Sequence, residues 1–141
     1  NLSETAITGA TLGILLSACP HLKWLSLAGS QADDQGVQQV SHLKQLRVLL
    51  LGRTRISDAA GVHLRQLTSL IDLDLSQTLI GDPGLGELQT LKALRRLTLE
   101  ATQITEERSA ELKRALPELN IVTGVEESQE EPADATPTVT T

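Results

Sequence analysis

The chain has 141 residues, a net charge of −6 and a hydrophobic content of 40%, which together indicate one globular domain. It contains 27 leucines but a single aromatic residue, Trp24, so leucine must fill the core and no stacking platform for single-stranded nucleic acid is available. The negative charge argues against binding to duplex nucleic acid, and no apolar run is long enough to span a membrane. We therefore expect neither a nucleic-acid partner nor a membrane span.

The first 21 residues match the second half of a pattern that recurs later in the chain. Leu2, Thr5, Ile7, Leu12 and Leu15 have the order and spacing of five later residues, Leu75, Thr78, Ile80, Leu85 and Leu88. We interpret residues 1–21 as half a repeat and expect upstream repeats or another domain before Asn1. Repeat arrays need a polar cap at each end, and the sequence shows no N-terminal cap.

Four complete blocks follow, at residues 22–45, 46–69, 70–93 and 94–118. Each opens with the pattern L-x-x-L-x-L, and successive starts lie 24 residues apart: Leu22, Leu46, Leu70 and Leu94. A hydroxyl residue stands three positions after the last leucine of each pattern: Ser30, Thr54, Thr78 and Thr102. Such a period predicts stacked units, because no block can bury its leucines alone.

Each block predicts a short strand, a turn and a helix of two to three turns. In the third block we expect Asp82 to be the N-cap and Pro83 the first helical residue. An acid recurs at every expected helix start, where it suits the positive end of the helix dipole: Asp34, Asp58, Asp82 and Glu106.

The chain ends in two different segments. Residues 119–125 are the expected closing segment of a repeat domain that spans residues 1–125, and Leu119 and Ile121 begin a fifth strand there that is not continued. Residues 126–141 hold five acids and two prolines but no lysine or arginine. They cannot bury enough apolar surface to offset the entropy of ordering, so the sequence predicts a disordered acidic tail.

The pattern L-x-x-L-x-L-x-x-T-x-I-x-D resembles the leucine-rich repeat family over about residues 2–121, in particular its bacterial repeats of about 24 residues. The stretch from Ser17 to Leu22 is also similar to the cysteine-containing class of these repeats. The family usually has Asn where this chain has Thr or Ser, and a hydroxyl can still bond the backbone of the turn.

The resemblance implies an α/β solenoid with short parallel strands on the concave face, helices on the convex face, and a protein partner. Extracellular arrays of the family carry cysteine-stapled flanks. This chain has one cysteine, which favours an intracellular or bacterial setting.

The residues between the strand leucines are the candidate partner contacts, because successive side chains of a strand alternate and the leucines point inward. One row across the strands is Trp24, Val48, Asp72 and Arg96. The next row is Ser26, Leu50, Asp74 and Thr98. Three flanking arginines could hold an anion or an acidic partner: Arg47, Arg53 and Arg55.

These candidates also have plain structural interpretations. Trp24 could pack on an upstream repeat as well as on a ligand, and the turn arginines could simply be solvated. Asp72 and Asp74 beside Arg96 are better explained as a solvated ion pair worth about 0 to 1 kcal/mol than as catalytic carboxylates. Val48 and Leu50 favour contact, because clustered exposed apolar residues mark binding sites.

No catalytic or metal-binding constellation emerges from the sequence. His21, His42 and His63 are spaced by 21 residues rather than 24, so the repeat does not bring them together. Cys19 lies at an expected helix end, and without a histidine to activate it we interpret it as a buried structural thiol. We therefore expect no enzymatic activity, cofactor, metal ion or small-molecule substrate.

Two functions remain open. In the first, the chain is a protein–protein interaction module that recognises a partner protein through its concave face. In the second, it is a structural or scaffolding subunit held in a larger assembly through its uncapped N-terminal side. Four strands about 4.8 Å apart form a face only about 15 Å wide, which is small beside a standard interface of about 800 Å² per partner.

Overall fold

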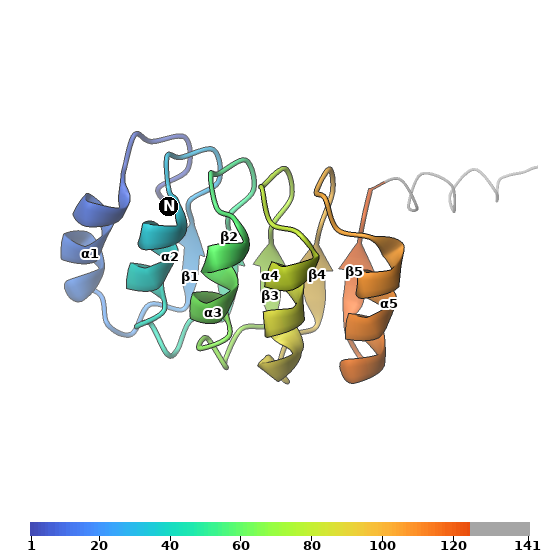
Figure 1. Ribbon diagram of the computed structural model, residues 1–141. Helices are drawn as coiled ribbons and strands as arrows, with labels where there is room; N and C mark the ends of the chain where they lie inside the picture. Colours follow the sequence, from blue (N-terminus) through green and yellow to red (C-terminus); the bar gives the residue numbers. More distant parts are fainter. Residues whose placement is uncertain (125–141) are drawn as a thin grey trace, which may run out of the picture.

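Within residues 1–124, five parallel strands of three residues each lie side by side in one sheet, in the order in which they occur along the chain. They are β1 (Trp24–Ser26), β2 (Val48–Leu50), β3 (Asp72–Asp74), β4 (Arg96–Thr98) and β5 (Asn120–Val122). The computed structural model describes residues 1–124, and Figure 1 shows the helices as a second layer along one side of the sheet. The predicted α/β solenoid is confirmed, while the predicted tail, residues 126–141, lies outside the described residues.

The helical layer is more broken than the sequence pattern predicts. Its α-helices are α1 (Gly9–Ser17), α2 (Asp34–Val40), α3 (Gly61–Leu64), α4 (Asp82–Gly86) and α5 (Glu106–Ala115). Two 3₁₀ segments, η1 (Asp58–Ala60) and η2 (Glu87–Thr90), complete the helical parts of the blocks at residues 46–69 and 70–93. Leu85, Leu88 and Leu91 recur every three residues, which is the period of a 3₁₀-helix and not that of an α-helix.

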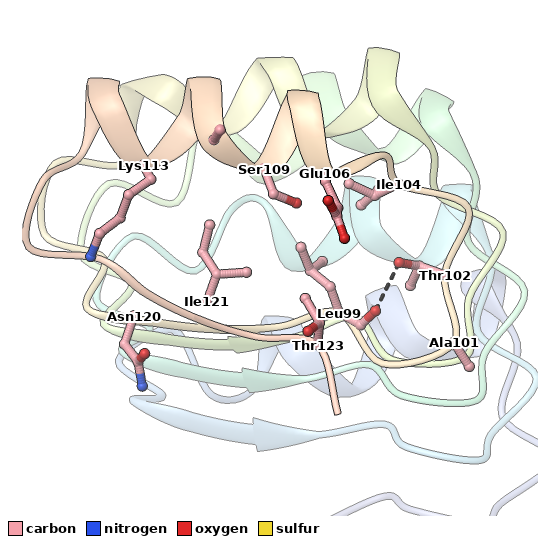
Figure 2. A pocket seen from close by; sticks show the side chains of 11 residues that line it. Leu99, Ala101, Thr102, Ile104, Glu106, Ser109, Lys113, Asn120, Ile121 and Thr123 are labelled. Atoms are coloured by element: carbon pink, nitrogen blue, oxygen red, sulfur yellow. Dashed lines mark hydrogen bonds between the residues drawn. The ribbon is translucent and has the colours of Figure 1, made fainter. Parts of the chain in front are cut away.

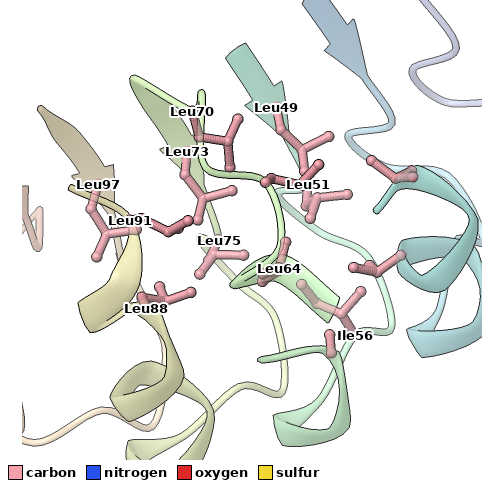
Figure 3. Packing of buried hydrophobic residues seen from close by; sticks show 14 of the residues in the cluster. Leu49, Leu51, Ile56, Leu64, Leu70, Leu73, Leu75, Leu88, Leu91 and Leu97 are labelled. Carbon is pink, nitrogen blue, oxygen red and sulfur yellow. The ribbon is translucent and has the colours of Figure 1, made fainter. Parts of the chain in front are cut away.

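The core lies between the two layers and consists mainly of leucine. The middle residues of the five strands, Leu25, Leu49, Leu73, Leu97 and Ile121, stand opposite one another in register. Figure 3 shows Leu49, Leu73 and Leu97 directed into the same space as Leu64 and Leu88 of the helical layer. Full burial of each leucine contributes about 1.5 to 3 kcal/mol, so stacking of neighbouring repeats supplies most of the stabilisation.

The recurring hydroxyl residues have a local structural role. Thr54, Thr78 and Thr102 each donate their hydroxyl to the carbonyl three residues earlier, at 2.6, 2.7 and 2.8 Å. Ser30 instead accepts a hydrogen bond from the backbone N–H of Ala32 at 3.2 Å. As expected, the hydroxyl satisfies the backbone of the turn that leaves each strand.

The recurring acids link each repeat to the next. Asp34 accepts hydrogen bonds from the N–H and hydroxyl of Ser57 at 2.7 and 2.5 Å. Asp58 Oδ1 accepts the N–H groups of Gly81 and Gly84 at 2.7 and 3.0 Å. A carboxylate of one repeat therefore satisfies backbone donors at the helix start of the following repeat.

Asp82 continues this series, and its predicted role as N-cap is wrong. Gly81 is the N-cap of α4, whereas Asp82 accepts the N–H and the hydroxyl of Thr105 in the next repeat, both at 2.9 Å. These bonds hold the pKa of the Asp82 carboxyl below its ordinary value, with a smaller contribution from the Arg108 guanidinium.

The first repeat differs from the others in length and in its cover. The N–H of Leu2 donates to the Ser26 carbonyl just as that of Leu27 donates to Leu50, both at 2.8 Å, so the first step is 25 residues long. Leu15, matched in the sequence to a core leucine, is exposed, and Cys19 is exposed rather than buried. Both lie at the outer end of the described array, where α2 is the neighbour of α1 in the helical layer.

Candidate interaction surface

The strand register brings the predicted concave row together. Trp24 lies opposite Val48, Val48 opposite Asp72, and Asp72 opposite Arg96. The row continues to Asn120 on β5, which sequence reasoning missed. The 24-residue step from Arg96 does reach Asn120, but Glu118 replaces the leucine that opens the other blocks. With five strands about 4.8 Å apart, the row is about 19 Å long.

The N-terminal half of this row is apolar. The side chain of Trp24 is 46% exposed, and Val48 and Leu50 on the neighbouring strand are half-buried. Ser26, predicted as a contact in the second row, is only 3% exposed. Its hydroxyl lies 2.6 Å from that of Ser3, so the N-terminal segment covers it and the expectation of an exposed Ser26 is wrong.

The C-terminal half of the row carries charge. Asp74 Oδ1 accepts hydrogen bonds from the N–H and hydroxyl of Ser76 at 2.9 and 2.7 Å. Asp72 is half-buried and has no hydrogen bond or ion pair with any side chain of residues 1–124, although Arg96 stands opposite it. The predicted ion pair with Arg96 is therefore not formed. Such an exposed pair gains too little energy to fix a long side chain in place.

The flanking arginines divide into one that is bound and two that are free. Arg53 Nη2 forms a salt bridge of 2.6 Å with Glu4 Oε2. Arg47 and Arg55 are exposed and have no carboxylate partner within the described part of the chain. Thr98, the remaining predicted contact, is half-buried on β4. The concave side therefore offers Arg47, Arg55 and Arg96 as unpaired cations.

A groove of about 780 Å³ opens at the C-terminal end of the array, between α5 and β5 (Figure 2). Leu99, Ile104 and Ile121 form its apolar wall. Glu106 stands one repeat after Asp82 in the series of linking acids, and within residues 1–124 it accepts no corresponding hydrogen bond. The hydroxyl of Thr123 is buried here without a partner in the same part of the chain.

Two other properties of residues 1–124 concern metal ions and membranes. No group of three or more His, Cys, Asp or Glu side chains there is arranged to hold a metal ion. No helix among these residues combines the length and apolar character needed to cross a bilayer.

Comparison with known proteins finds a family model that matches part of the chain and solved structures with a similar fold. Residues 44–104 match the family model described as leucine rich repeat. A leucine-rich repeat protein of Leptospira interrogans is 25% identical with a TM-score of 0.52, over 79% of this chain and 32% of its own. An internalin from Listeria monocytogenes is 20% identical with a TM-score of 0.52, over 76% of this chain and 36% of its own.

A third similar structure is actin-binding site 2 of leiomodin-1, with 15% identity and a TM-score of 0.61 over 79% of this chain and 75% of its own. The likenesses to the internalin and to leiomodin-1 concern the fold alone. The chain spans about a third of the length of the two bacterial proteins. Among curated protein sequences none matches this chain significantly.

Proposed function

We propose that this chain, whose residues 44–104 match the leucine rich repeat model, is a leucine-rich repeat domain that binds a partner protein through its concave face, without catalysis. Domains of this family generally act as protein–protein interaction modules. The proposal for this chain is more specific, because it assigns the contact to the strand side of the array and to named residues.

One observation carries the proposal: the exposed Trp24 lies opposite the half-buried Val48 on the neighbouring strand, and the half-buried Leu50 follows Val48 on the same side of β2. The two positions that follow along the sheet, Asp72 and Asp74, are charged. Apolar side chains clustered in water at the edge of a polar surface are typical of contact sites. Tryptophan, the residue type of Trp24, is also enriched at the energetic centres of interfaces.

The dimensions of the face favour a small contact. A face about 19 Å long and two outward residues deep covers a few hundred Å², well below the roughly 800 Å² that each partner buries in a standard interface. The exposed turn residues Arg55 and Leu79 extend this area at the ends of the strands. We therefore expect the concave face to take one short element of the partner.

The test is affinity capture from native lysate with the parent chain and with the double variant Trp24→Asp, Leu50→Asp as baits. Val62→Asp is the matched control, because Val62 on the helical layer is 45% exposed, like Trp24 at 46%. Unfolding midpoints establish that all three baits are folded. A protein bound by the parent and by the control but lost by the double variant supports the proposal, and equal capture by all three contradicts it.

A second candidate function is favoured by α1, where Ile14 is 74% exposed and Leu15 is also exposed. In this alternative the chain is a scaffolding subunit held in an assembly through that end of the array. A bait with Ile14→Asp and Leu15→Asp should then lose its partner, while the concave variant keeps it. An isolated chain that stays monomeric at micromolar concentration would argue against self-assembly through α1.

A further inference from the structure

We propose that the concave face binds an amphipathic helix that crosses the strands and presents two apolar residues, then a cationic residue, then an anionic residue, in the direction from β1 to β4. This inference rests on the proposed function, because it names the element of the partner that the concave face would take. It is carried by the order of side chains along one row, by their unpaired charges and by the spacing of the strands.

The order along the row is unambiguous because the strand register fixes it. Trp24 and Val48 occupy the first two strands, Asp72 the third and Arg96 the fourth. The second row repeats the apolar and acidic positions with Leu50 and Asp74. A partner that runs across the sheet therefore meets two apolar strands, one acidic strand and one basic strand.

The charges on this row are free to meet a partner. Within residues 1–124 neither Asp72 nor Arg96 takes part in a salt bridge or a side-chain hydrogen bond, although four other arginines of the chain do form salt bridges: Arg53, Arg65, Arg95 and Arg108. Asp72 is half-buried and its carboxylate has no cationic partner within residues 1–124, so a cation on the partner would be the first to meet it. Complementary charges of this kind fix the register of a bound element more than they raise its affinity.

The spacing of the strands selects a helix over an extended segment. Three steps across the sheet cover about 14 Å. Three turns of an α-helix cover about 16 Å, so side chains spaced one turn apart stay within about 2 Å of the four strand positions. An extended segment places side chains of one face about 6.8 Å apart and covers about 20 Å in three steps, which leaves the last one about 6 Å out of place.

The width of the face agrees with the same occupant. A helix is about 10 Å across with its side chains, and the two outward rows together with the arginines at the strand ends provide a strip of similar width. A helix of three to four turns therefore occupies this small face without contacts elsewhere.

The test uses two synthetic helical peptides of 18 residues with identical composition. One presents Leu, Leu, Lys and Glu at successive turns of a single face, and the other presents Leu, Leu, Glu and Lys. Because Trp24 is the only aromatic residue of the chain, its fluorescence reports binding at this face directly. We expect the first peptide to shift Trp24 emission and to bind about tenfold more tightly than the second.

The charge-exchanged variant Asp72→Arg, Arg96→Asp should invert this preference, and Asp72→Asn, a milder change, should reduce it. Unfolding midpoints verify that both variants fold. Equal binding of the two peptides, no binding of either, or an unchanged preference in the exchanged variant overturns the inference. If the peptides fail while the Trp24→Asp, Leu50→Asp bait still loses its captured protein, only the helix inference falls; if that bait also retains its protein, the proposed function falls with it.

Discussion

The inward and outward residues of the strands differ sharply although they are neighbours in the sequence. The inward position of the first four strands is always leucine: Leu25, Leu49, Leu73 and Leu97. The outward position one residue earlier is a different residue in every strand: Trp24, Val48, Asp72 and Arg96. Packing between repeats explains the first column, because every inward side chain meets the same neighbours. No such packing constrains the second column, which is therefore where a partner can be specified.

Truncating one residue of each column tests whether the inward column stabilises the fold and the outward column does not. Leu73→Ala removes a fully buried side chain between two repeats and should lower the free energy of unfolding by about 2 to 5 kcal/mol. Asp72→Ala, one position earlier and without a side-chain partner within residues 1–124, should change it by less than about 0.5 kcal/mol. Urea unfolding measures both, and equal effects would contradict the stacked core.

Polar links between repeats should matter less than leucine but more than the outward row. Asp58→Ala leaves the N–H groups of Gly81 and Gly84 without their acceptor, and we expect a loss of about 1 to 3 kcal/mol. Asp58→Asn keeps an acceptor oxygen and should recover part of that loss. An Asp58→Ala protein as stable as the parent would show that water replaces the carboxylate without cost.

The regular part of the molecule could be predicted from sequence because the repeat itself encodes it. The 24-residue period gave the strands, their register and the alternation that places Trp24 and Val48 on the outer side. The period gave no information about contacts that form only once in the fold. Ser3 covers Ser26, and Asp72 and Arg96 have no side-chain partner within residues 1–124. Both features depend on tertiary geometry, which a local sequence pattern does not indicate.

The roles of the recurring acids were missed for a different reason. An acid at a helix start is explained well enough by the helix dipole, so nothing prompted a second role. Yet Asp34 and Asp82 each precede a hydroxyl residue by 23 positions, Ser57 and Thr105. This spacing of an acid and a hydroxyl residue is the sequence feature that indicates hydrogen bonds between neighbouring repeats.

Two glycines of α4 differ in the space that surrounds them. A Cβ on Gly84 would lie 2.6 Å from Ile80 Cγ1 and 2.8 Å from Asp58 Oδ1, so Gly84→Ala should cost about 1 to 3 kcal/mol. A Cβ on Gly86 would meet nothing closer than Arg108 Nη1 at 3.8 Å, and Gly86→Ala should stabilise the protein by about 0.4 to 1 kcal/mol. Thermal unfolding of the pair tests this, and a shift of the same sign in both would contradict the tight approach of repeats at Gly84.

The smallest expected effect is a dependence of stability on pH through Asp82. Its pKa in the folded chain is lowered, chiefly by the hydrogen bonds from Thr105, so the unfolded chain binds a proton more readily than the folded one. The resulting stabilisation is complete above the ordinary aspartate pKa of about 3.9 and is lost as the pH falls through the lower value of the folded state. The difference in urea midpoint between the parent and Asp82→Asn should therefore be constant near neutral pH and shrink below about pH 4. Other acids titrate alike in both proteins and cancel in the comparison. A difference that persists unchanged to pH 3 would mean that Asn accepts from Thr105 as the carboxylate does, and that the link between repeats depends on the acceptor oxygen and not on its charge.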